Sequence, residues 1–137
     1  MSPIAIGATG DTLTFQSYFD GWGYVRLFKN GTGKLAELDT YAIPQAHDPA
    51  FADGFGDLSV HEVATSPTQS SLAYYSYSSG GLRVTRIENG KLVEKGHLID
   101  QGGSNLWGVD VFEDAGKEYV AASDRDKGLY VFRYTGG

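Results

Sequence analysis

Gly81-Leu82-Arg83-Val84-Thr85-Arg86-Ile87 returns further along the chain as Gly128-Leu129-Tyr130-Val131-Phe132-Arg133-Tyr134. A looser copy, Gly23-Tyr24-Val25-Arg26-Leu27-Phe28, precedes both. The leucines of the first two stretches are 47 positions apart, and the strand-like runs 58–63 and 106–111 that precede them are 48 apart. A period of this length, carried by strand-forming residues, is typical of proteins built from repeated small sheets. The sequence therefore predicts a repeat protein.

The middle repeat contains four apolar or aromatic runs that are separated by turn signals. The last two runs are joined by Asn89-Gly90, a strong hairpin signal because a type I′ turn needs positive φ at both central residues. We expect the four runs to pair antiparallel in chain order, which is the form of one β-propeller blade. The predicted strands of this blade are 58–64, 72–78, 82–88 and 92–99.

Two further blades follow from the same pattern. The last one has predicted strands at 106–112, 117–123 and 129–134, and no fourth strand. The first one is predicted to contain strands at 13–19, 24–29 and 35–43. The predicted architecture is thus one all-β domain, 1–137, of about three propeller-type blades at about 1–44, 57–100 and 105–135.

Ile4-Ala5-Ile6 leaves two alternatives open. It is either a short first strand of the first blade or the missing fourth strand of the last blade. The spacing to the next strand favours the first alternative, because it is close to the spacing of the corresponding strands in the last blade.

Three blades cannot close a ring that normally takes roughly four to eight, and the end blades would expose apolar faces and unpaired edges. We therefore expect a partner of the same fold. It is either a second copy, giving a homo-oligomeric ring of about six blades, or the remaining blades of a longer protein. The start inside a blade and the terminal Gly136-Gly137 favour a fragment of a longer chain.

The stretches Tyr74-Tyr75-Ser76-Tyr77-Ser78-Ser79-Gly80-Gly81-Leu82-Arg83-Val84 and Val120-Ala121-Ala122-Ser123-Asp124-Arg125-Asp126-Lys127-Gly128-Leu129-Tyr130-Val131 resemble the LVIVD-repeat proteins of bacteria. The resemblance covers about three repeats, essentially residues 13–134. It departs from the family pattern where Asp and Pro often follow the Leu-x-Val-x strand, since this chain has Arg86-Ile87-Glu88-Asn89 there. The resemblance implies a β-propeller, an extracellular or cell-surface location, and no assigned activity.

The amino-acid composition agrees with an all-β domain and argues against nucleic acid and the membrane interior as partners. Nine Tyr, seven Phe and two Trp favour strands, and 19 Gly provide turns. A net charge of −6 argues against nucleic acid, whose binding depends on a basic surface. No apolar run approaches the roughly 20 residues that cross a bilayer, so we expect no membrane insertion. The chain has no cysteine, which excludes disulfides and thiolate metal sites but leaves the compartment open.

The first strand of each blade lies nearest the central channel, so Glu62 and Asp110 are expected to converge there. With His61, and with His47-Asp48 in the preceding loop, they could hold Ca²⁺ or a transition metal. The alternative is that the two carboxylates bind backbone groups and that His61 is a packed or surface residue. No fixed metal-ligand spacing is present, and we favour the alternative, with no required cofactor.

Two loops on one face of the molecule are candidate binding segments. His47, Asp48, Phe51 and Phe55 lie in the longest irregular stretch, 44–57. Asn105 and Trp107 in the stretch 100–107 add an amide and an indole suited to sugars or peptides. In both loops the aromatic residues could equally pack within the protein.

A third loop contains Asp124-Arg125-Asp126-Lys127-Gly128, whose order is similar to the start of a calcium loop. It lacks the distal bidentate acid of an EF-hand, and the equivalent hairpin of the preceding repeat contains no acids. We therefore expect a tight turn in which Asp and Gly serve the backbone.

Catalytic motifs are absent from the sequence. There is no Gly-x-Ser-x-Gly elbow, no cysteine nucleophile and no phosphate-binding glycine loop. The sequence therefore favours a non-catalytic propeller segment that acts in protein binding or extracellular scaffolding. A metal-dependent propeller hydrolase or lactonase and a carbohydrate-binding propeller are the alternatives.

Overall fold

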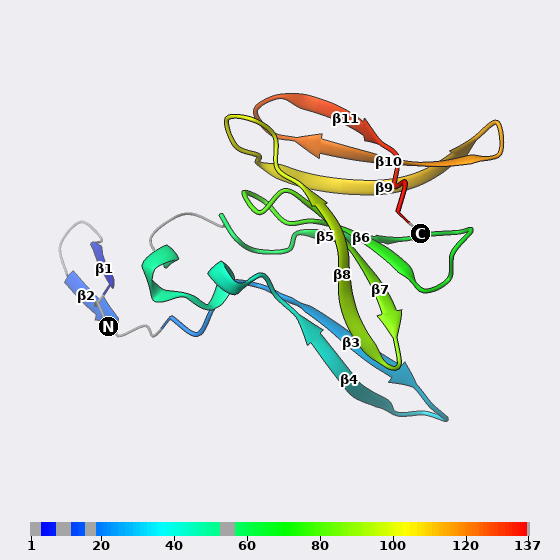
Figure 1. The fold of residues 1–137 in the computed structure, drawn as a ribbon. Helices are drawn as coiled ribbons and strands as arrows, with labels where there is room; N and C mark the ends of the chain where they lie inside the picture. Colours follow the sequence, from blue (N-terminus) through cyan, green and yellow to red (C-terminus); the bar gives the residue numbers. More distant parts are fainter. Residues whose placement is uncertain (1–3, 8–11, 16–18, 53–56, 137) are drawn as a thin grey trace.

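The computed structural model describes residues 4–7, 12–15, 19–52 and 57–136 (Figure 1). Within these residues the chain is all-β, with antiparallel strand pairs and two short 3-10 helices. None of the helical segments described is long and apolar enough to cross a membrane. The elements are β1 (Ile4–Gly7), β2 (Thr12–Phe15), β3 (Val25–Asn30), β4 (Leu35–Tyr41), η1 (Pro44–His47), η2 (Pro49–Phe51), β5 (Glu62–Thr65), β6 (Leu72–Ser76), β7 (Leu82–Glu88), β8 (Lys91–Leu98), β9 (Leu106–Asp114), β10 (Lys117–Asp124) and β11 (Gly128–Phe132).

The middle of the chain forms a four-stranded meander in the order β5-β6-β7-β8. This confirms the predicted antiparallel blade of four strands in chain order. The β7–β8 hairpin closes on the pair Glu88↔Lys91. Asn89 and Gly90 have φ of 52° and 76°, the positive values that a type I′ turn requires. The only large shift from the predicted bounds is in β5, which begins at Glu62 and not at residue 58.

The C-terminal sheet has three strands in the order β9-β10-β11, and the described residues add no fourth strand to it. At the other end, β1 pairs with β2 and β3 pairs with β4 in two separate sheets. β1 therefore lies beside the next strand of the chain and not beside β11, as in the first of the two alternatives for Ile4-Ala5-Ile6.

We expected β2 and β3 to be neighbouring strands of one sheet, but in the structure they do not pair with each other. The segment before β3 bonds to other parts of the chain. The Trp22 N–H donates to the Ala46 carbonyl at 2.8 Å. The Gly23 carbonyl accepts from the Val60 N–H at 3.0 Å. These bonds tie the segment to the loops around it, so it does not form a tight β2–β3 turn.

The β9–β11 sheet and the β3–β4 sheet lie on either side of the central sheet (Figure 1). Every residue of β6 is buried, because successive side chains of a strand point to opposite faces and both faces of this sheet are covered. One core lies between the central sheet and β9–β11, and is built from Leu72, Tyr74, Leu82, Val84, Leu106, Val109, Val120 and Ala122. The other lies between the central sheet and the β4–η1 segment, and is built from Tyr41, Ile43, Ala46, Ala73, Tyr75 and Tyr77.

Carboxylates join the stacked sheets at their edges. Glu118 of β10 accepts hydrogen bonds from Ser66 at 2.5 Å, from Thr68 at 2.6 Å and from Tyr74 at 2.7 Å. Burial opposes ionisation of Glu118, but the three hydroxyl donors outweigh it and hold the pKa of this carboxyl below its usual range. The bonds connect β10 to β6 and to the loop before β6.

A second carboxylate, Glu94 of β8, serves the β4–β8 contact. It accepts from the Tyr41 hydroxyl and from Arg83 at 3.3 Å, and it pairs with His97 at 2.8 Å. Burial disfavours its charged form, yet these donors keep the pKa of Glu94 below its usual range. Both outer sheets are thus held to the central one by an apolar core and by a charged hydrogen-bond acceptor.

Candidate functional site

Glu62 and Asp110 line one open groove, about 620 Å³ in volume, where β5 and β9 lie side by side. The two side chains that were expected to converge therefore line the same groove. Ser123 and Leu129 line the same groove from β10 and β11. The groove lies along the strand edges that a propeller would turn toward its channel.

The two carboxylates bind backbone groups within the groove. Glu62 Oε2 accepts from the Val109 N–H at 2.9 Å and so joins β5 to β9. Asp110 Oδ1 accepts from the Val111 N–H at 2.8 Å. Across the described parts of the chain, no three His, Asp or Glu side chains come together as metal ligands. These contacts match the alternative in which both carboxylates serve the backbone.

His61 lies outside this pair and packs on Trp107. Its ring centroid is 3.7 Å from that of the indole, and its Nδ1 is 2.7 Å from the Trp107 carbonyl oxygen. The Arg125 guanidinium lies 4.8 Å from the Trp107 ring centroid, within cation–π range. The indole therefore contacts two side chains of the protein itself, which matches packing between neighbouring sheets.

Asn105 binds the Asp-x-Asp-x-Gly turn at 124–128 and does not line the groove. Its N–H donates to Asp124 Oδ2 at 2.8 Å, and its side-chain amide donates to Asp126 at 2.9 Å. Asp124 Oδ1 also accepts from the N–H groups of Asp126 and Lys127 at 2.9 and 3.1 Å. Burial works against its charge, but these backbone donors hold the pKa of Asp124 below its usual range. The predicted backbone-serving turn is what the structure contains.

The described part of the first candidate binding loop, residues 44–52, packs against the segment before β3. The His47 ring lies 5.8 Å from that of Tyr24, and Asp48 Oδ1 caps η2 by accepting from the Ala50 N–H at 2.9 Å. The Phe51 carbonyl accepts from the Trp22 indole N–H at 2.8 Å, while the Phe51 side chain is exposed. Phe55 lies outside the described residues.

Exposed apolar side chains lie on the outward faces of the β9–β11 and β3–β4 sheets, here called the end sheets. On β9–β11 this surface includes Leu129 and Val131, which are 71% and 55% exposed, beside the stacked rings of Phe112 and Tyr119. On the opposite end, Phe28 and Leu35 project from β3–β4. Val25 and Tyr41 of the same sheet point toward the central one, and alternation along β3 turns Phe28 the other way. The register shift between Leu27 and Phe28 places Leu35, the partner of Asn30, on the same outward face as Phe28.

The sequence contained the signal for the first of these surfaces. Leu129 and Val131 align with Leu82 and Val84 when the repeated stretches 81–87 and 128–134 are superimposed in sequence. Strand alternation then places them on one face, but only the stacking order of the sheets identifies that face as the outward one.

Comparisons with protein-family models, with curated proteins and with solved structures give no match to this chain. The resemblance to LVIVD-repeat proteins therefore stays a prediction from sequence motifs. The surfaces described above are the basis for a proposal about function.

Proposed function

We propose that this chain is a non-catalytic β-propeller-type segment that acts in protein association, with sheets of the same architecture covering its end faces. One comparison carries the proposal. Leu82 and Val84, which are 4% and 5% exposed, are buried beneath the β9–β11 sheet. Their counterparts in the repeat, Leu129 and Val131, are 71% and 55% exposed on the outward face of that sheet.

The same surface chemistry thus occurs twice, once covered by a sheet and once open. Leu and Val gain roughly 1.5–3 kcal/mol each when fully buried, so covering the open copy would be favourable. Exposed apolar patches of this kind, next to polar surroundings, mark association surfaces in soluble proteins. The next sheet in the stack is the natural cover.

The other end of the stack offers a complementary surface. Phe28 and Leu35 project outward from β3–β4, on the face opposite its contact with the central sheet. Two copies stacked head to tail would bring this face against Leu129 and Val131. Such an interface joins two different surfaces, so it extends or closes by rotation from copy to copy. We take the second copy as the same-fold partner to be tested.

Solution mass measured by sedimentation over a range of concentrations tests this proposal. We expect a mass above that of the 14.8 kDa monomer, rising with concentration. Leu129→Glu should shift the mass to that of the monomer, because it places a charge in the interface. The matched control is Ile87→Glu, which replaces an exposed aliphatic residue away from β9–β11 and should leave the mass unchanged.

A wild-type protein that sediments as a monomer at every concentration would refute association between copies. Equal behaviour of the two variants would show that the Leu129 face is not the interface. Circular dichroism of each variant establishes that it is folded before its mass is interpreted.

A further inference from the structure

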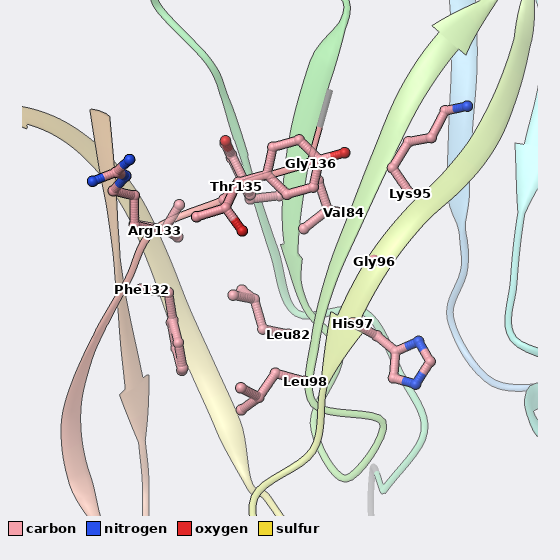
Figure 2. A pocket seen from close by; sticks show the side chains of 13 residues that line it. Leu82, Val84, Lys95, Gly96, His97, Leu98, Phe132, Arg133, Thr135 and Gly136 are labelled. Atoms are coloured by element: carbon pink, nitrogen blue, oxygen red, sulfur yellow. The ribbon is translucent and has the colours of Figure 1, made fainter. Parts of the chain in front are cut away.

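A cavity of about 300 Å³ opens between the central sheet and the last strand of the C-terminal sheet (Figure 2). In Figure 2, Leu82, Leu98 and Phe132 point toward the space between β7–β8 and β11. Gly96 of β8 leaves one wall without a side chain, and the segment 133–136 runs across the cavity. The cavity is therefore an apolar space bounded by two sheets and a short stretch of chain.

This cavity adjoins a strand edge that is free within the described residues. β11 pairs with β10 on one side, and no described strand lies on its other side. In the central sheet the corresponding edge of β7 is occupied by β8, through pairs such as Leu82↔Leu98 and Val84↔Gly96. Because Leu129 and Val131 align with Leu82 and Val84, β11 offers a matching edge for one more strand.

We propose that the β11 edge is a docking site for an extended peptide segment of another protein, which adds antiparallel to β11 as a fourth strand. Alternate side chains of that strand would point to the same face as Tyr130 and Phe132, which pack against the central sheet. They would enter the cavity beside Gly96 and Leu98. Main-chain hydrogen bonds supply affinity in this mode of recognition, and the alternate side chains supply specificity.

The contact between β4 and β8 shows how such a strand would meet its neighbour. Each is the fourth strand of its predicted blade, and the two strands contact each other between the β3–β4 sheet and the central sheet. The Tyr41 hydroxyl of β4 binds Glu94 of β8, and Asp39 of β4 accepts from the Leu92 N–H at 2.8 Å. A strand beside β11 would meet β8 from its other face in the corresponding way.

Charge at the cavity defines the docking segment further. Lys95 is paired with Glu88 at 2.6 Å and His97 with Glu94 at 2.8 Å. Arg133, which also lines the cavity, forms no salt bridge within the described part of the chain. The segment that fits is therefore extended, with apolar residues at alternate positions and an acidic residue near Arg133. The sequence of β4, Leu-Ala-Glu-Leu-Asp-Thr-Tyr, places Ala36 and Leu38 at alternate positions with an acidic residue next to Leu38 on either side, and it provides the probe.

The probe is a fluorescently labelled peptide with the sequence of residues 35–43, and the readout is anisotropy during titration with the full chain. We expect saturable binding. Gly96→Leu should weaken it by about tenfold or more, because the new side chain fills the cavity. A Cβ at Gly96 meets only Tyr134 Cε2 at 3.8 Å, an ordinary contact, so the variant should fold. Gly31→Leu, in the distant β3–β4 turn, is the matched control and should bind like wild type.

Two further measurements separate strand addition from other occupants. Amides of residues 128–132 should gain protection from hydrogen exchange when the peptide is bound, which a small apolar molecule in the cavity would not cause. A peptide of the same composition with its apolar residues grouped together should bind more weakly, since it cannot place alternate side chains in the cavity. Arg133→Ala should weaken binding of the original peptide.

Absence of saturable binding, or binding without protection of β11, would overturn the proposal. So would equal binding by wild type and Gly96→Leu. The titration is also run on Phe28→Glu, which charges the β3–β4 side of the proposed interface between copies and leaves β11 unchanged, so that association between copies does not compete with the peptide. Failure of self-association therefore leaves the edge proposal intact, and failure of peptide binding leaves the association proposal intact.

Discussion

Gly81 occupies the turn between β6 and β7 with φ of 79°, a conformation that residues with a Cβ rarely adopt. A Cβ at this position would also overlap the carbonyl oxygen of Leu98, at the end of β8. Gly90 in the β7–β8 turn has a similar φ of 76° but open space around it. Substitution of Gly90 therefore measures the cost of backbone strain alone, and substitution of Gly81 measures strain together with steric overlap.

Gly81→Ala should destabilise the fold by about 2–4 kcal/mol, because strain and overlap with backbone act together. Gly90→Ala should cost about 1 kcal/mol, since it adds strain alone. Urea denaturation followed by circular dichroism measures both values. Similar losses for the two variants would contradict the close approach of Leu98 to Gly81.

Residue patterns predicted one of these turns more fully than the other. Asn89-Gly90 indicated a type I′ hairpin, and both residues have positive φ in the structure. The lack of space for a Cβ at Gly81 is due to the carbonyl of Leu98, which lies 17 positions later in the chain. A local motif contains no information on such a contact.

At the scale of elements, Glu118 connects β10 to Tyr74 of β6 and to the loop that contains Ser66 and Thr68. Its pKa is lower in the folded chain than the ordinary value of 4.5. Ionised Glu118 therefore stabilises the fold above that value, and the contribution is lost as the pH falls through the lowered pKa.

Glu118→Gln should reduce the free energy of unfolding by about 1 kcal/mol at pH 7, because the charged acceptor is lost from a partly exposed site. The difference from wild type should shrink as the pH falls through the lowered pKa of Glu118, because the wild-type carboxylate then becomes protonated. Urea unfolding at a series of pH values measures it. Asp114→Asn changes an exposed carboxylate at the end of β9 and should alter stability by no more than about 0.5 kcal/mol. A loss that is independent of pH would contradict the role of the Glu118 charge.

The elements themselves were predictable to different degrees. The central and C-terminal meanders followed from apolar runs and turn residues, because neighbouring antiparallel strands need only local information. The separation of β2 from β3 did not, because Trp22 and Gly23 bond to Ala46 and Val60, which lie in other parts of the chain.

At the scale of the whole molecule, the central sheet is covered on both faces and the end sheets on one. Backbone hydrogen bonds that are shielded on both faces should open only with large-scale unfolding. We expect hydrogen exchange to be slowest in β6 and β7 and faster in β3 and β4. Exchange followed by mass spectrometry on the full chain measures this order. Equal protection of β3–β4 and β6–β7 in a monomeric sample would contradict it.

The sequence alone determined the strand class, the chain order of the meanders and the repeat that equates Leu82 with Leu129. These features depend on alternation and turn chemistry, which act over a few residues. Only the tertiary structure decided that Leu82 is buried and Leu129 is exposed, that Glu62 and Asp110 bind backbone amides, and that a cavity adjoins β11. Burial depends on which sheet covers which face, and that is set by contacts between residues far apart in the chain.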